Sequence, residues 1–202
     1  MIKIGRRNGF SLPDLFLEVV SIVFGILFAL WLNGWQTDRQ HEHSVQKSLR
    51  NIRTEIRNNR KNLSRVFPYH QTCLRTISDS HGEEVVENFF SIWRGLRPPI
   101  LHRSAYETAR EVQALAYMDY ETASAISLLY SRQEFIFQLM RMYAQVFISD
   151  LNRSDARRLA ITLQPAFSDI VQAEQELATQ YQKVLILLDQ LQQKNGIISF
   201  SH

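Results

Sequence analysis

Residues 15–35, with the sequence LFLEVVSIVFGILFALWLNGW, decide the fold of this 202-residue chain. As one α-helix at about 1.5 Å per residue, the segment would be about 32 Å long, which matches the hydrocarbon core of a bilayer, about 30 Å thick. Its Leu, Ile, Val and Phe residues each favour insertion by about 0.3–0.6 kcal/mol, and together they outweigh about 2.5–3.5 kcal/mol for its one charge, Glu18. The sequence therefore predicts a single transmembrane helix over residues 15–35, preceded by a basic tail at residues 1–14.

A cleaved signal peptide is the alternative interpretation of the N-terminus. Lys3, Arg6 and Arg7 would form its basic region. However, the apolar stretch is longer than in a signal peptide, and Ala29-Leu30-Trp31 differs from the usual small-x-small cleavage site. The tryptophans near the far end suit a membrane interface. We therefore expect the segment to remain as an anchor.

The rest of the chain is long enough for one domain with a single core. A hydrophobic content of 45%, with only seven glycines and five prolines, argues against disorder and against a turn-rich β fold. The single cysteine, Cys73, excludes an intramolecular disulfide. We expect no second membrane span, because the other apolar stretches are short and interrupted by charges.

The net charge of +3 hides an uneven distribution of charges. Residues 44–78 contain eight Lys or Arg and one acid, whereas residues 79–202 contain eleven and fifteen. The basic residues on the two sides of the apolar segment are nearly balanced, so the positive-inside rule gives only a weak preference. We expect the N-terminus in the cytoplasm and the C-terminal domain outside.

Helical periodicity dominates after the anchor. Apolar residues and one Asn recur at alternating spacings of four and three, the seam of a heptad helix: Val45, Leu49, Ile52, Ile56, Asn59, Leu63 and Val66. This pattern predicts a juxtamembrane amphipathic helix over residues 36–66, continuous with the anchor and ended by Phe67-Pro68. Residues 67–202 are then expected to form an antiparallel helical bundle.

The bundle helices have recognisable boundaries. Short helices are predicted at residues 69–78, 83–94 and 104–116, the last started by a capping box formed by Ser104 and Glu107. Asp119 is expected to cap a long helix that extends to about residue 151. After a turn at residues 152–155, a helix is expected that Pro165 ends or kinks. A final helix is expected over residues 166–194, ended by Asn195-Gly196. The fold class is therefore all-α.

Small and polar residues form a row within the membrane segment. Ser21, Gly25, Ala29 and Asn33 recur every four residues, and Glu18 lies on nearly the same face. Small residues at this spacing let two membrane helices approach closely, and Asn33 could hydrogen-bond across the contact. We expect this face to pack against another helix, although it could instead face lipid. Glu18 is either a functional intramembrane carboxylate or an interfacial residue at a helix N-terminus.

A basic stripe follows the heptad seam and comprises Arg50, Arg53, Arg57, Arg60 and Lys61. We expect it to pair with acidic residues of the same domain or of a neighbouring chain. Anionic lipid headgroups and simple solvation are the alternatives. Nucleic acid is a weaker candidate, because no recognised nucleic-acid-binding fold accompanies the charge, and we expect no nucleic-acid partner.

Catalytic and metal-binding signals are weak. In His41-Glu42-His43 the two imidazoles would point in different directions from a helix, so they cannot chelate one metal. Cys73 and His70 lack a recognisable orienting acid motif. Nucleotide, dinucleotide, nucleophile-elbow and zinc motifs are all missing from the sequence. We therefore expect no catalytic residues, no cofactor or metal, and no enzymatic activity.

Two blocks of sequence carry a resemblance to a known family. The first is the pattern Glu18-x6-Gly25-x3-Ala29-x5-Trp35, followed by a charged helix with Leu49, Glu55 and Ile56. The second is Tyr106-Glu107-Thr108-Ala109, then Ala114-Leu115-Ala116-x-Met118-Asp119-Tyr120, Tyr130 and Gln133. Together they cover about half the chain, which resembles an uncharacterised family of small bacterial single-pass membrane proteins, a domain of unknown function. Val112-Gln113 replaces an expected Thr-Gly, and Tyr117 replaces an expected His.

The resemblance implies a location in the bacterial inner membrane and an architecture, but no reaction. We expect a membrane-anchored helical scaffold, either a homo-oligomer or bound to another membrane protein, with lipid as its other partner and no known small-molecule ligand. A sensory module is the first alternative, in which the bundle binds a small ligand near Tyr106, Glu107, Met118, Asp119 and Tyr120, residues that could instead be a cluster in the core. An accessory subunit of an ion-conducting assembly that uses Glu18 is the second.

Overall fold

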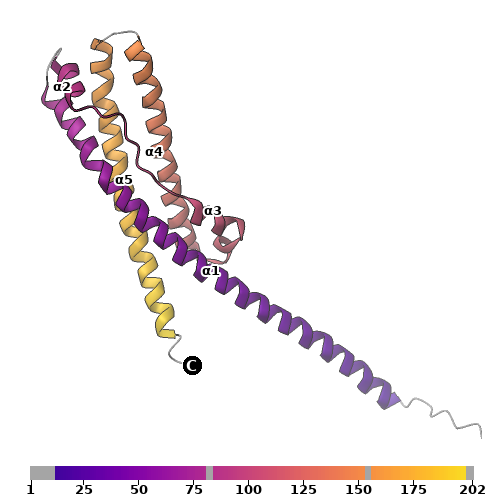
Figure 1. The fold of residues 1–202 in the computed structure, drawn as a ribbon. Coiled ribbons are helices and arrows are strands. Elements are labelled where there is room, and N and C mark those ends of the chain that lie inside the picture. The colour runs from indigo at the N-terminus through magenta and orange to yellow at the C-terminus, as the bar shows by residue number, and fades with distance from the viewer. Residues whose placement is uncertain (1–11, 81–83, 153–155, 199–202) are drawn as a thin grey trace, which may run out of the picture. The chain divides into compact units, whose positions relative to one another are not determined.

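The protein is almost entirely helical in the computed structural model, which describes residues 12–80, 84–152 and 156–198. These residues form α1 (Leu12–Asp79), α2 (Glu84–Ile92), α3 (Ser104–Glu111), a 3-10 turn η1 (Ala114–Tyr117), α4 (Tyr120–Asn152) and α5 (Ala156–Ile198) (Figure 1). The described residues contain no strand, so the predicted all-α bundle is confirmed. The chain divides into two compact units, Met1–Ser44 and Val45–His202, and α1 contributes to both.

The first unit is the N-terminal part of α1. Its large apolar side chains between Phe16 and Trp35 are 44–69% exposed. Among the described residues, α1 alone is long and apolar enough to cross a membrane, with a mean hydropathy of 2.1 in its most apolar window. None of that window is buried, which distinguishes it from the core helix of a soluble domain.

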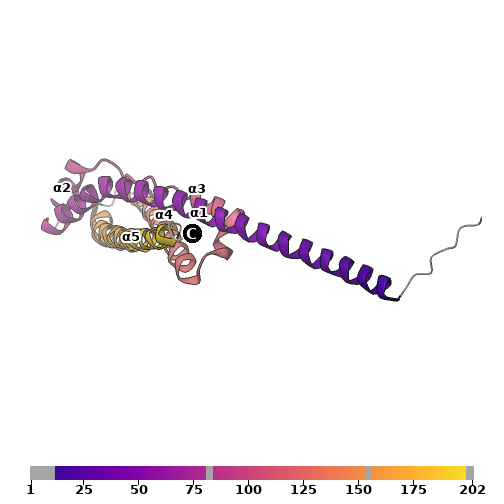
Figure 2. The ribbon, with the colours of Figure 1, turned by 90° about the horizontal axis from the view of Figure 1, so that it is seen from below.

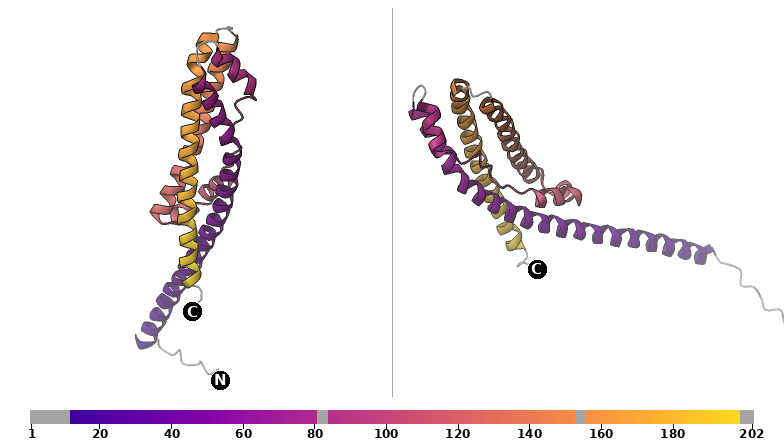
Figure 3. Two further views of the ribbon diagram at one scale, coloured as in Figure 1. Left: turned by 90° about the vertical axis from the view of Figure 1, so that its left-hand side faces the viewer. Right: turned by 45° about the horizontal axis from the view of Figure 1, so that its top comes forward.

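The second unit is a bundle in which residues 45–79 of α1 run beside α4 and α5 (Figures 1 and 3). The chain direction of α5 is opposite to that of α1 and α4 (Figure 1). The view from below shows α4 and α5 nearly end-on beside α1 (Figure 2). The predicted seam of α1 faces the core, where Ile52, Ile56 and Leu63 are buried.

Two apolar clusters fill the core of the bundle. The larger one includes Ile56, Ile126, Leu129, Leu177 and Val184. The smaller one is rich in aromatic side chains and includes Cys73, Phe89, Phe147, Leu163 and Phe167. In the larger cluster, Ile126 and Leu129 come from one face of α4, and Leu177 and Val184 come from one face of α5.

The predicted helix end at Phe67-Pro68 is wrong, because α1 continues to Asp79. Proline inside a helix removes one hydrogen bond and crowds the preceding turn, at a cost of about 3 kcal/mol. Here the residues beyond it continue the buried seam: His70, Cys73 and Ile77. Their packing offsets the local cost, so the helix predicted at residues 69–78 is the last part of α1. Residues from Val45 onward already belong to the bundle unit.

Two further predicted breaks are absent from α5. Pro165 lies inside this helix and is exposed, while the adjacent Ala166 and Phe167 are fully buried. The helix also continues through Asn195-Gly196 to Ile198. Asn and Gly in a helix each cost no more than about 1 kcal/mol, which does not oblige the helix to stop. The turns predicted at residues 79–82 and 152–155 lie largely outside the described residues.

The helix predicted over residues 104–116 is split. It ends at Glu111 as α3, and η1 follows after Gln113, which has a left-handed backbone with φ 58°. The predicted capping box is also wrong, because the N-cap residue is Arg103 and its side chain makes no capping hydrogen bond. The hydroxyl of Ser104 instead donates to Glu55 of α1.

The predicted N-cap of α4 is confirmed. The carboxylate of Asp119 accepts a 2.9 Å hydrogen bond from the backbone N–H of Thr122. Hydrogen bonding by Thr122 lowers the pKa of the Asp119 carboxyl. The anionic form is therefore favoured at the positive end of the helix dipole.

Gln113→Gly should stabilise the protein. A left-handed backbone costs a non-glycine residue about 1–2 kcal/mol, whereas glycine adopts it freely at an entropic cost of about 0.5–1 kcal/mol. We expect the free energy of unfolding to rise by about 0.5–1 kcal/mol, measured by urea unfolding of the detergent-purified chain followed by circular dichroism. The adjacent Val112→Gly, where φ is −81°, is the control and should destabilise. A lower free energy of unfolding for Gln113→Gly would contradict the expectation.

Candidate functional site

The predicted membrane-packing row is uncovered. Glu18, Ser21, Gly25, Ala29 and Asn33 are all exposed in the first unit. A Cβ atom added at Gly25 would meet no atom within 4 Å. Within the described part of the chain, a larger side chain at Gly25 would therefore disturb no contact.

An aromatic face borders this row on the same helix. The rings of Phe24, Phe28 and Trp31 follow one another at centroid distances of 6.3 and 5.9 Å. At the end of the apolar segment the guanidinium of Arg39 lies 4.2 Å from the centre of the Trp35 ring. This cation–π contact places a charge where the apolar stretch gives way to polar sequence, as expected of an interfacial anchor.

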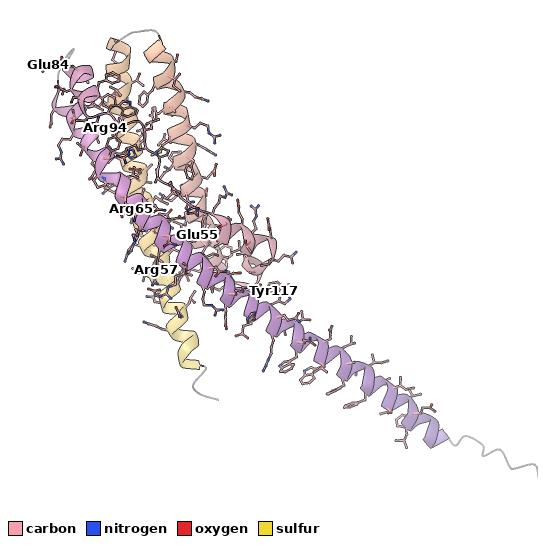
Figure 4. All side chains as sticks on the ribbon, in the orientation of Figure 1. Glu55, Arg57, Arg65, Glu84, Arg94 and Tyr117 are labelled. Atoms are coloured by element: carbon pink, nitrogen blue, oxygen red, sulfur yellow. The ribbon has the colours of Figure 1, made fainter. Side chains whose placement is uncertain are left out.

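Glu55 is the centre of a buried hydrogen-bond cluster in the bundle. One carboxylate oxygen accepts from the hydroxyl of Tyr130 at 2.7 Å. The other accepts from the hydroxyl of Ser104 and the backbone N–H of Ala105, both at 2.9 Å. Glu55 thereby caps α3 from α1, in place of the predicted capping box, and Figure 4 labels it on the side of α1 where α3 lies.

Next to Glu55, one polar residue from each main helix forms a layer across the core: Asn59 of α1, Gln133 of α4 and Tyr181 of α5. They are 0%, 2% and 0% exposed. The amide oxygen of Gln133 accepts from the Asn59 amide at 3.2 Å and from the Tyr181 hydroxyl at 2.8 Å. Asn59 and Gln133 also hold the backbone of His102 through three hydrogen bonds of 2.6–3.0 Å.

Burial keeps the tyrosines of this region neutral. It raises the pKa of Tyr130, and the hydrogen bond to Glu55 and its negative charge raise it further. Burial also raises the pKa of Tyr181, with a smaller contribution from the charge of Glu55. Both hydroxyls therefore remain donors throughout the pH range in which the protein could be studied.

His70 and Glu174 form a second buried polar contact, and both side chains are fully buried. Nδ1 of His70 lies 2.9 Å from each carboxylate oxygen, and Nε2 lies 2.6 Å from the carbonyl oxygen of Leu96. A carbonyl can only accept, so Nε2 must carry a proton. The remaining proton lies between Nδ1 and Glu174, giving either an ion pair or a neutral pair with the same total charge. Removing one member would leave the other buried without its partner.

This pairing argues against a nucleophilic role for Cys73. Both ring nitrogens of His70 are occupied by Glu174 and Leu96, so neither is available to the thiol. Cys73 is fully buried, and burial raises the pKa of its thiol. The neutral thiol is a poor nucleophile. In the described part of the chain no group of three or more His, Cys, Asp or Glu residues is placed to hold a metal ion.

The basic stripe partly faces α5. Arg53 and Arg57 approach the carboxylate of Asp189 at 2.5 and 3.7 Å. Arg60 hydrogen-bonds Gln182, and Arg53 also contacts Gln192. Arg50 and Lys61 are exposed. The Asp189 side chain is 43% exposed, so these surface pairs contribute at most about 1 kcal/mol each.

The predicted ligand residues do not form one site. Tyr106 stacks on Tyr130 with ring centroids 4.4 Å apart, and Glu107 pairs with Arg103 at 2.7 Å. Met118 packs against the core, and Asp119 caps α4. Tyr120 is 88% exposed. The five residues therefore make different contacts, and Tyr106 also lines a cleft.

Two clefts flank the Arg103–Glu134 ion pair, whose charged atoms are 2.8 Å apart. The Tyr106 cleft, between α3 and α4, has a volume of about 360 Å³ and is lined by Tyr106, Arg110, Ser127, Ser131 and Gln138. The Arg141 cleft lies between α4 and the segment after α2. It has a volume of about 500 Å³ and is lined by Leu96, Pro98, Phe137, Met140, Arg141 and Ala144. The sequence patterns indicated neither cleft, because each depends on how the segment after α2 crosses the bundle.

These features define an all-α protein with an exposed apolar N-terminal helix and a bundle that contains buried polar contacts. No protein-family model matches the chain, and neither a curated protein nor a solved structure matches it. The family resemblance inferred from the sequence motifs therefore stays a prediction.

Tyr130→Phe should lower the free energy of unfolding by about 1.5–3 kcal/mol, because it removes a buried hydrogen bond to a charged group. The matched control is Tyr120→Phe, which removes the same hydroxyl from an exposed side chain and should change stability by no more than about 0.5 kcal/mol. Urea unfolding of the detergent-purified chain measures both. In a Glu55→Gln background the cost of Tyr130→Phe should be about 1 kcal/mol smaller. Equal costs in the two backgrounds would show that the two residues are not coupled.

Proposed function

We propose that the protein is a single-pass protein of a bacterial inner membrane that acts as a helical scaffold, with its N-terminus in the cytoplasm and its bundle outside. The observation that carries the proposal is the uncovered apolar segment between Phe16 and Trp35. Exposure of these large apolar side chains to water costs about 25 cal/mol for each Å² of apolar surface. A bilayer removes that cost for the whole segment at once.

Association within the membrane is the second part of the proposal. The row of Ser21, Gly25, Ala29 and Asn33 is uncovered, and helices in lipid associate through such close-packing faces. Glu18 lies on nearly the same face and could accept a hydrogen bond from a partner helix. We take the partner to be a second copy of the chain, because self-association requires no other protein.

The bundle suits a scaffold better than a site of chemistry. Two pairs of its buried side chains bind each other: Glu55 with Tyr130 and His70 with Glu174. Groups that are fully buried and paired stabilise one conformation and are not free to meet a substrate. The sensory alternative has weaker support, because its predicted residues are engaged in different contacts: Glu107 with Arg103, Met118 with the core and Asp119 with the start of α4.

The anchor should resist extraction. When membranes from cells that produce the protein are washed with high salt and alkaline carbonate, the chain should remain in the pellet and be released only by detergent. Val23→Lys combined with Ile26→Lys places two charges at the middle of the segment, at a cost of about 2.5–3.5 kcal/mol each. This variant should move to the soluble fraction. Recovery of the unaltered chain in the aqueous fraction would refute the membrane proposal.

Gly25→Ile should weaken association of the chains in the membrane. The added side chain meets nothing within the chain, so the change acts only on contacts with other molecules. Gly34→Ile is the matched control: its Cβ also meets no atom within 4 Å, and nine residues, about two and a half helical turns, place it on the opposite face. Amine-reactive cross-linking in native membranes should show fewer cross-linked pairs for Gly25→Ile and an unchanged yield for Gly34→Ile. Equal yields for both variants would exclude the small-residue face.

A further inference from the structure

We propose that the Arg141 cleft binds a small amphipathic carboxylate, such as a medium-chain fatty acid. The cleft belongs entirely to the bundle unit, and the proposal does not depend on the scaffold role or on the membrane anchor. Its volume of about 500 Å³ lies within the range of about 300–1,000 Å³ that is usual for small-molecule sites.

The walls of the cleft are mainly apolar. Phe137, Met140 and Ala144 come from one face of α4, and Leu96 and Pro98 come from the segment after α2. Met140 is nearly buried, at 4% exposure, and both Leu96 and Phe137 pack partly against the core. These residues therefore form a well-packed apolar surface that suits an unbranched hydrocarbon chain.

The charges around the cleft favour an anion. Arg103 and Glu134 lie at one end and neutralise each other through their ion pair, and Arg103 also binds Glu107. Arg141 lies further along the same face of α4, and within the described residues no acidic side chain pairs with it. One guanidinium is therefore left to bind an external carboxylate, which it can do through two hydrogen bonds.

The path of the segment after α2 keeps the cleft open. Hydrogen bonds from His70 to Leu96, from Asn62 to Ile100 and from Asn59 to His102 hold this segment on α1. Its Leu96 and Pro98 side chains therefore form a fixed wall opposite α4. A preformed site loses little free energy on binding, because few groups must be ordered.

The test uses a decanoate that carries a diazirine near the end of its chain, added to the full-length protein in nanodiscs of zwitterionic lipid. After illumination, mass spectrometry should find the label on residues 96–98 or 134–144. Unlabelled decanoate should compete at about tenfold lower concentration than decanol, because only the carboxylate can bind Arg141. Decylamine, with the opposite charge, should compete no better than decanol.

Three variants test the assignment. Arg141→Gln should remove the preference for decanoate over decanol and lower labelling about tenfold. Arg75→Gln removes the same charge from an exposed position on α1 and should label like the unaltered protein. Ala144→Phe fills the cleft and should reduce labelling by every probe, with circular dichroism confirming that the variant is folded.

Other results would overturn the proposal. Label confined to residues 16–35 would show that the probe only partitions into the bilayer. Equal competition by decanoate and decanol, or unchanged labelling of Arg141→Gln, would show that Arg141 does not select a carboxylate. None of these results bears on the anchor or on the association of chains, which the extraction and cross-linking experiments test separately.

Discussion

The bundle depends on the polar layer formed by Asn59, Gln133 and Tyr181. Each of these residues lies on the inward face of its helix, so burial is unavoidable, and a buried amide or hydroxyl without a partner costs about 1–3 kcal/mol. The three satisfy one another only when the helices stand in the observed register. A shift of any helix by one turn would place an amide against apolar side chains. The layer therefore selects one alignment of α1, α4 and α5 where apolar packing alone would tolerate several.

Side chains of α1, Asn59 of the layer among them, determine the path of the chain between α2 and α3. This segment contains no helix, so its backbone groups need partners from elsewhere. Side chains of α1 supply them: Tyr69 and His70 bind the backbone of Gly95 and Leu96, and Asn59 binds that of His102. Glu55 binds Ala105 at the start of α3. Tyr69 and Glu55 are separated by about four turns of α1, so contacts along this length of the helix hold the segment between α2 and α3. Both clefts beside Arg103 are consequences of that path.

Periodicity predicted which faces of the helices would be buried, but not which buried residues would meet. Asn59 already stood out as the one polar residue of the heptad seam. Glu174 was missed although it lies four residues after Ile170 and three before Leu177, the spacing of a core position, because a glutamate is seldom buried without a partner and its partner is distant in the sequence. His70 was missed because Pro68 suggested that the helix had ended. The pairing of His70 with Glu174 spans 104 residues, and no local pattern contains that information.

The buried polar contacts also bear on the choice between a scaffold and a sensor. Signalling through a helical bundle requires a helix to slide or rotate between two alignments of similar free energy. Here a shift of α1 would break the layer at Asn59 and the contact of His70 with Glu174 together. Leaving even one buried polar group without a partner costs about 1–3 kcal/mol. A ligand in the Arg141 cleft would touch α4 and the segment after α2 without entering either contact, so its binding would add to a bundle of fixed alignment. That property suits a platform on which partners assemble.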